Sequence, residues 1–139
     1  MHKDLIKKFN ATWLEIDTIY NEYAKKHSLS YTAVLLLRHV LEYEGHYTQV
    51  ELANVLGLPK QGIHSIVKDF LEKGYLNLRE AKDRRYKEII LTEAGKSFTK
   101  DILKSLNKAE EALQSLEEEE IEFLVNIMVK YIERLKTTL

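Results

Sequence analysis

The chain has 139 residues, which is enough for one compact domain with its own core and too few for two independent ones. It contains no cysteine, so disulfides and thiolate metal ligands are excluded. It has neither an apolar run of membrane-spanning length nor a signal-peptide pattern, so we expect a cytoplasmic protein. Charged residues make up 31% of the chain against five glycines and one proline, which predicts an ordered, mainly helical fold, and the formal net charge is −1.

The first predicted helix runs from Leu5 to about Lys26 and carries a stripe of large apolar and aromatic side chains. The members of the stripe are spaced four and three residues apart, as in a coiled-coil seam. They are Phe9, Trp13, Ile16, Tyr20 and Tyr23. Such a stripe needs a cover, and we expect part of it to pack on the rest of the chain and part to pack across a dimer interface.

A second helix is predicted from Tyr31 to Tyr43. Ser30 is placed to cap its first turn, and Leu29 and Val34 have the spacing of a hydrophobic staple. The helix is apolar over much of its circumference, so we expect it to lie at the centre of the fold. Gly45 is predicted to end it.

A short third helix and a tight turn follow. Thr48 and Glu51 match a capping box, so the third helix begins near Gln49, and Gly57 ends it. A fourth helix is predicted from about Lys60 to Lys73. One face of the fourth helix is apolar, with Ile63, Ile66, Val67, Phe70 and Leu71. This order of short helix, glycine turn and amphipathic helix is typical of a helix-turn-helix.

The outward face of the fourth helix is rich in hydrogen-bond donors. It carries Lys60, Gln61, His64, Ser65 and Lys68. In a helix-turn-helix we expect Gln61, His64 and Ser65 to contact base edges and the two lysines to contact phosphates. The alternative is that these residues form an ordinary solvated helix face. Gly62 costs about 1 kcal/mol relative to alanine in a helix interior. Either the first turn approaches the DNA backbone closely, or it is simply weak.

Two short strands follow, around a charged tip. Gly74 stands where a helix ends in a left-handed residue, residues 75–79 alternate like a half-buried strand, and residues 86–91 form the returning strand. Residues 57–90 contain eight basic and five acidic side chains, whereas the chain from Asp101 onward is acidic. A hairpin with a basic tip after a recognition helix is a wing, and the charge distribution is compatible with oriented binding to DNA.

The segment resembles the winged-helix domain of the multiple-antibiotic-resistance regulator (MarR) family. The resemblance is carried by Leu71-Glu72-Lys73-Gly74-Tyr75-Leu76, Arg79, Asp83-Arg84-Arg85, and Leu91-Thr92 with Gly95. It implies a homodimeric transcriptional regulator, a repressor of double-stranded DNA sites that a small aromatic ligand releases. It also implies that Asp83 and Arg85 form the Asp-x-Arg element of the wing, in which Asp83 orients an arginine. The DNA-binding residues of the wing would then be Lys82, Asp83, Arg84 and Arg85.

Two more helices complete the chain. A long helix opens after Thr92, with a stripe of Phe98, Ile102, Leu106, Ala109, Leu113 and Leu116. Ser115 and Glu118 match a second capping box, which starts a last helix with Ile121, Leu124, Val125, Met128, Ile132 and Leu135.

We therefore predict a mainly α fold with a small β-hairpin wing. Residues 1–139 form one domain, in which residues 45–92 are the DNA-binding lobe and residues 1–44 and 93–139 are the helical dimerisation region. A twofold dimer would place its recognition helices roughly 34 Å apart, which suits a palindromic operator.

Several side chains suggest a ligand site. The resemblance implies an aromatic effector in a cleft, for which the candidates are Trp13, Tyr20, Tyr23, Tyr31 and Tyr43, the alternative being core packing. His39, Glu42 and His46 could instead form the site of a metal-responsive regulator, although no cofactor is predicted. A winged helix can also serve as a protein-interaction module. Motifs of enzymes are absent from the sequence.

Overall fold

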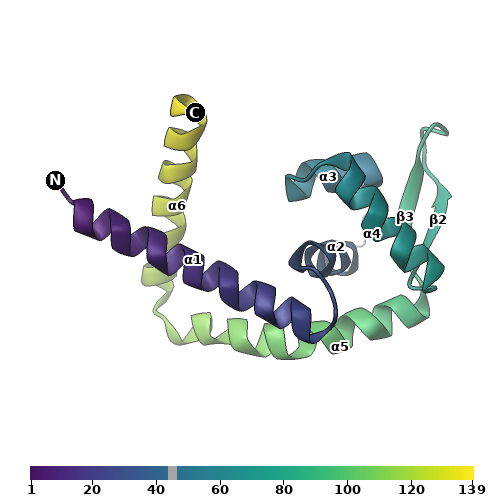
Figure 1. The fold of residues 1–139 in the computed structure, drawn as a ribbon, viewed down its shortest axis with the longest axis horizontal. Coiled ribbons are helices and arrows are strands. Elements are labelled where there is room, and N and C mark those ends of the chain that lie inside the picture. Colours follow the sequence, from purple (N-terminus) through teal and green to yellow (C-terminus); the bar gives the residue numbers. More distant parts are fainter. Residues whose placement is uncertain (44–46) are drawn as a thin grey trace. The chain divides into compact units, whose positions relative to one another are not determined.

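The computed structural model describes residues 1–43 and 47–139, in two compact units, residues 1–102 and 103–139. The first unit contains α1 (Lys3–Lys26), α2 (Tyr31–Glu42), β1 (Tyr47–Thr48), α3 (Gln49–Leu56), α4 (Lys60–Glu72), β2 (Leu76–Glu80) and β3 (Lys87–Leu91) (Figure 1). The helix α5 (Glu93–Glu110) runs from the first unit into the second, which continues with the 3₁₀ helix η1 (Glu111–Ser115) and with α6 (Glu118–Thr138). The predicted mainly helical fold with a small sheet is confirmed.

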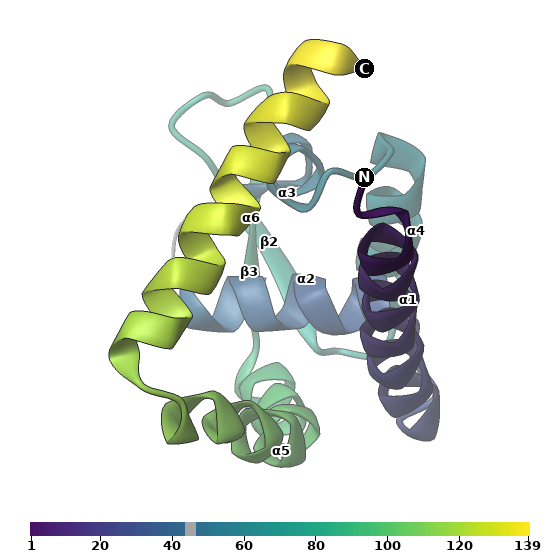
Figure 2. The same ribbon diagram turned by 90° about the vertical axis from the view of Figure 1, so that its left-hand side faces the viewer.

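The core of the first unit is built around α2, as its apolar circumference predicted. The Ser30 hydroxyl caps α2 by accepting a hydrogen bond from the Ala33 amide at 3.1 Å. The helix packs against α1, α3 and β3 (Figure 2). The largest fully buried side chains of the unit come from α2, α3, α4 and the base of the sheet, among them Leu36, Leu37, Leu52, Ile63, Phe70, Leu76 and Ile89. The predicted end of α2 at Gly45 lies outside the described residues.

The sheet has three antiparallel strands in the order β1-β3-β2, one more than the predicted hairpin. The added strand β1 pairs Tyr47 with Ile89, and it is only two residues long, too short to show an alternating pattern in the sequence. The predicted alternation of burial along the first hairpin strand is wrong: Leu76 is buried, but the other four residues of β2 are exposed. On β2 only Leu76, at the base of the hairpin, is buried in the core.

The connection between α5 and α6 differs from the prediction. The helix α5 ends at Glu110, so Leu113 and Leu116 lie beyond its stripe and are 52% and 40% exposed. The capping box expected at Ser115 and Glu118 is also wrong. Glu117 caps α6 with its carboxylate, and the Glu120 carboxylate accepts from the Glu117 amide at 3.0 Å. In a run of four glutamates several capping registers compete, because a carboxylate accepts amide hydrogen bonds as readily as a hydroxyl does.

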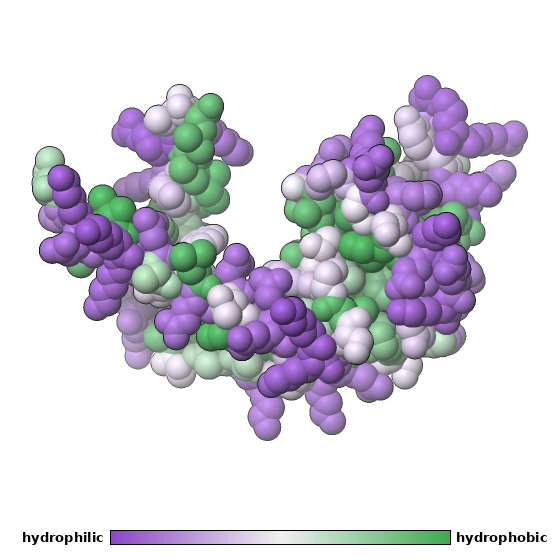
Figure 3. Space-filling view, in the orientation of Figure 1, coloured by the Kyte–Doolittle hydropathy of each residue, from purple (hydrophilic) through white to green (hydrophobic). Residues whose placement is uncertain are grey.

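Two helices carry large exposed apolar surfaces. On α1 the exposed side chains include Leu5, Ile6, Phe9, Trp13 and Ile16. On α6 they include Phe123, Leu124, Val125, Ile127, Met128, Val129, Tyr131 and Ile132, which are between 38% and 67% exposed. Parts of these surfaces are green in Figure 3. Among the described residues, no helix is both long enough and apolar enough to span a membrane.

Candidate nucleic-acid interface

The helices α3 and α4 form a helix-turn-helix, in which residues close in sequence determine where α3 begins and ends. The Thr48 hydroxyl caps α3 by accepting from the Glu51 amide at 3.2 Å, and it donates to the Glu51 carboxylate at 3.3 Å. Gly57 ends α3 in the left-handed region with φ 64°, as predicted. On α4, Ile63, Val67 and Phe70 are buried. The helix-turn-helix is therefore held by the core of the first unit along one face of α4.

All five predicted donor residues lie on the solvent side of α4. Lys60, Gln61, His64, Ser65 and Lys68 are each exposed. Gly62 is exposed as well, and a Cβ built at this position has no atom within 4 Å outside its own helix backbone. Packing within the chain therefore does not explain why glycine stands at position 62.

A hydrogen bond between the two helices reaches the donor face. Nδ1 of His64 lies 3.2 Å from Oε1 of Gln49, the first residue of α3. Gln49 was not among the predicted site residues. The two residues are 15 positions apart, and neither helical period nor motif spacing in a single sequence relates them. Their proximity follows from the angle at which α3 and α4 pack.

At the wing, which we define as β2, β3 and residues 81–86 between them, Asp83 holds Arg85 in a two-pronged pair. Oδ2 of Asp83 accepts from Nη2 of Arg85 at 2.7 Å, and Oδ1 accepts from Nε at 3.0 Å and from the Arg85 amide at 3.1 Å. These hydrogen bonds lower the pKa of Asp83 and raise the pKa of Arg85. The arginine side chain is nevertheless 80% exposed. Its guanidinium is thus oriented and accessible at once.

The other basic residues of the wing tip are differently placed. Lys82 and Arg84 are exposed. The guanidinium of Arg85 also lies 5.6 Å from the centre of the Tyr86 ring. Lower on the hairpin, Arg79 pairs with Glu88 at 2.9 Å across the strands. The tip of the wing therefore carries three exposed cations, Lys82, Arg84 and Arg85. Arg79, which is nearer the base of the hairpin, is paired with Glu88.

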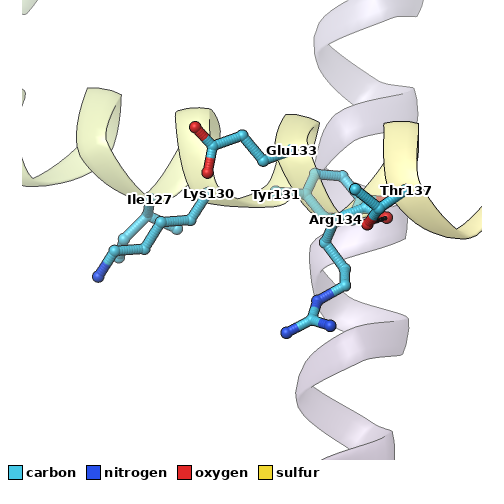
Figure 4. Close-up of a pocket in the computed structure, with 6 residues that line it drawn as sticks. All are labelled: Ile127, Lys130, Tyr131, Glu133, Arg134 and Thr137. Carbon is cyan, nitrogen blue, oxygen red and sulfur yellow. Dashed lines mark hydrogen bonds between the residues drawn. The ribbon is translucent and has the colours of Figure 1, made fainter.

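Two hollows lie outside the donor face. The first, of about 520 Å³, is bordered by the start of α3 and the wing, with Thr48, Glu51, Ala81, Lys82, Asp83, Tyr86 and Glu88. The second, of about 550 Å³, lies along α6 and is lined by Ile127, Lys130, Tyr131, Glu133, Arg134 and Thr137 (Figure 4). All six lining residues of the second hollow come from one helix. It is therefore an open surface groove within its unit.

The predicted aromatic ligand residues fall into separate groups. Tyr20 and Tyr31 face each other with ring centres 5.1 Å apart, and Tyr23 lies 5.0 Å from the His27 ring. Trp13 is 50% exposed, with its ring centre 6.1 Å from that of Phe9. Tyr43 follows the last residue of α2, and its ring contacts that of His39. Tyr31 begins the same helix, so Tyr31 and Tyr43 are separated by roughly 18 Å along the helix axis. The structure thus brings Tyr20 and Tyr31 together and leaves Tyr43 apart from them.

The predicted metal ligands are not brought together in the part of the chain that the structure describes. The ring of His39 stands 4.4 Å from that of Tyr43 and 4.7 Å from that of Tyr47. The Glu42 carboxylate pairs with Arg38 at 3.0 Å. His46 is the predicted ligand that the structure does not describe. Within residues 1–43 and 47–139, no three potential ligands are gathered in a metal-binding group.

A helix-turn-helix with an exposed donor face, followed by a hairpin wing, defines a winged-helix protein. The model of the MarR family matches residues 27–85 of the chain. The fold matches a MarR family regulator from Neisseria meningitidis at a TM-score of 0.81 and 20% identity, covering 96% of this chain and 95% of that one. It also matches MepR from Staphylococcus aureus in its DNA-binding conformation, at a TM-score of 0.80 and 19% identity over 94% and 98% of the two chains.

A third match is the complex of Staphylococcus aureus MepR with DNA, at a TM-score of 0.73 and 18% identity over 93% of this chain and 96% of that one. No curated protein matches. Residues 27–85 thus resemble the MarR family, and the chain shares its winged-helix fold with the solved structures of MarR family regulators.

Proposed function

We propose that the protein is a homodimeric, sequence-specific repressor that binds a palindromic site in double-stranded DNA and is released by a small aromatic ligand. One observation carries the proposal: every predicted donor on α4 is exposed, in the same unit as a wing whose tip carries exposed cations. An exposed row of lysine, glutamine, histidine and serine offers both phosphate and base-edge contacts. The MepR–DNA complex, in which a similar fold binds DNA, supports this function.

The two parts of the interface have different tasks. We expect α4 to enter the major groove, where Gln61, His64 and Ser65 read base edges and Lys60 and Lys68 contact phosphates. The wing would lie along the backbone or in the minor groove. There Arg85, held by Asp83, and Arg84 would contribute charge without direct base readout. Sequence preference would thus come from α4, and most of the salt dependence from the cations.

Dimerisation follows from the uncovered apolar faces of α1 and α6. A soluble monomer rarely exposes contiguous apolar patches of more than a few hundred Å². Eight large apolar side chains of α6 are exposed in a single copy, and Trp13 and Ile16 of α1 are exposed with them. A second copy of the chain would cover these faces and would double the number of recognition helices. Such a dimer fits a palindromic operator.

Ligand release requires that the ligand bind two states of the dimer with different affinity. The pair Tyr20 and Tyr31 joins α1 to α2, so an aromatic molecule that inserts beside these rings would change how the first helix packs on the core. We expect Trp13 fluorescence to report binding, because its side chain is half-exposed on the same helix. A broad aromatic screen that changes neither the fluorescence nor the DNA affinity would remove this part of the proposal.

The direct test of the function is selection of bound DNA from a random pool by the full chain. The proposal predicts enrichment of one palindrome, with half-sites about one helical turn apart. The control is a variant with Lys60, Gln61 and His64 all changed to alanine, which keeps the buried face of α4. Recovery of no common sequence by the wild type would contradict the proposal and would favour a protein-interaction role for the winged helix.

A further inference from the structure

The His64 ring is held from outside its own helix. It lies on the exposed face of α4, and its Nδ1 is 3.2 Å from Oε1 of Gln49. Gln49 follows the cap residue Thr48, which is buried and bonded to the Glu51 amide. The cap holds the backbone at the start of α3, from which the Gln49 side chain reaches the imidazole of His64.

This hydrogen bond also selects one form of the imidazole. In the structure the Gln49 amide turns its Oε1 towards Nδ1 of His64, and because an amide oxygen only accepts, Nδ1 carries the proton of this hydrogen bond. In a neutral imidazole the second nitrogen then has no proton and is an acceptor. Gln49 thus leaves Nε2 of His64 as an acceptor. Without Gln49, either tautomer would be available.

The major groove distinguishes an acceptor from a donor. Adenine and cytosine each present an exocyclic amine there, whereas guanine presents N7 and O6, and thymine presents O4. On the basis of the proposed function, we infer that Gln49 is a specificity-determining positioning residue. By holding Nδ1–H of His64, it makes the base pair opposite this side chain favour adenine or cytosine on the contacted strand. Gln49 acts through His64 and need not touch the base.

The test is selection of bound DNA at about pH 8, where imidazole side chains are as a rule neutral. Wild type, His64→Ala, Gln49→Met and Gln49→Glu are compared as full chains. Methionine matches glutamine in length, but its thioether sulfur is only a weak acceptor for Nδ1–H, whereas the carboxylate of glutamate accepts as the amide oxygen does. The measured quantity is the base preference at each position of the half-site.

We expect the wild type to prefer an amino-bearing base at one position by about tenfold. His64→Ala and Gln49→Met lose the preference at that same position and keep it elsewhere, which also shows that both variants fold. Gln49→Glu retains it. The double variant Gln49→Met, His64→Ala loses no more than His64→Ala alone, because the two residues act as one unit.

Three results would overturn the inference: a preferred guanine or thymine at the position affected in His64→Ala, an unchanged preference in Gln49→Met, or a loss in Gln49→Glu equal to that in Gln49→Met. In each case the wild type still selects a palindrome, so the proposed function stands. A wild type that selects no sequence would contradict the proposed function and this inference together.

Discussion

At the scale of single residues, the structure separates side chains needed for folding from those free to contact DNA. On α4, Ile63, Val67 and Phe70 are buried, Ile66 and Leu71 are half-buried, and the five donors are exposed. The helical period of the sequence shows this division. It does not show the bond between Gln49 and His64, because that bond depends on the packing of two helices.

Gly62 gives the first prediction at this scale. Alanine at position 62 meets no atom of the surrounding chain within 4 Å, so Gly62→Ala should raise the free energy of unfolding by about 1 kcal/mol. If the glycine allows close approach to the DNA backbone, the same change should weaken operator binding. Thermal unfolding and a binding titration measure the two effects. Stabilisation with unchanged affinity would show that the glycine has no part in DNA binding.

The wing gives the second prediction. Asp83→Ala should reproduce the loss of affinity caused by Arg85→Ala, because Asp83 holds the guanidinium through both carboxylate oxygens. Both changes should weaken binding to many sequences alike, unlike His64→Ala, which alters preference at particular base pairs. Lys136→Ala on α6 is the control for removal of a positive charge elsewhere. Tighter binding by Asp83→Ala, as simple loss of a negative charge would cause, contradicts the assigned role.

At the scale of elements, local signals predicted what local chemistry determines. The caps at Ser30 and Thr48, the end of α3 at Gly57 and the left-handed conformation of Gly74 were predicted correctly, because each depends on a few neighbouring residues. The strand β1 and the end of α5 at Glu110 were not. A two-residue strand exists only through its partner β3, and α5 ends although its apolar period continues in the sequence. Tertiary packing decides such features.

The junction of α4, β2 and α5 gives the third prediction. The Thr92 amide donates to the Tyr75 carbonyl at 3.1 Å, and the Tyr75 ring stacks on Phe98 with centres 4.1 Å apart. A Cβ at Gly95 would overlap the Tyr75 carbonyl. Gly95→Ala should therefore destabilise the fold by about 1–3 kcal/mol. Gly62→Ala is the matched control, since the same substitution there is predicted to stabilise. Equal effects of the two changes on thermal unfolding would contradict the packing argument.

At the scale of the whole molecule, the exposed apolar faces of α1 and α6 give the fourth prediction, which is dimerisation. The full chain should be a dimer at micromolar concentration, and Ile132→Glu should shift it towards monomer by placing a charge among exposed apolar side chains of α6. Asn126→Glu adds the same charge to the same helix outside its predicted apolar stripe and should leave the dimer intact. Light scattering that finds a well-folded monomer of the unmodified chain would rule out the dimer.

The central claim, that α4 and the wing bind DNA, is tested most directly by titrating the full chain against its selected operator and a scrambled duplex at several salt concentrations. We expect preference for the operator and an affinity that falls steeply with salt. Because Arg84→Ala and Arg85→Ala each remove a cation that we propose meets a phosphate, the salt slope of either variant should be shallower by about one unit. Equal affinity of the wild type for both duplexes, or binding that does not depend on salt, would contradict the claim.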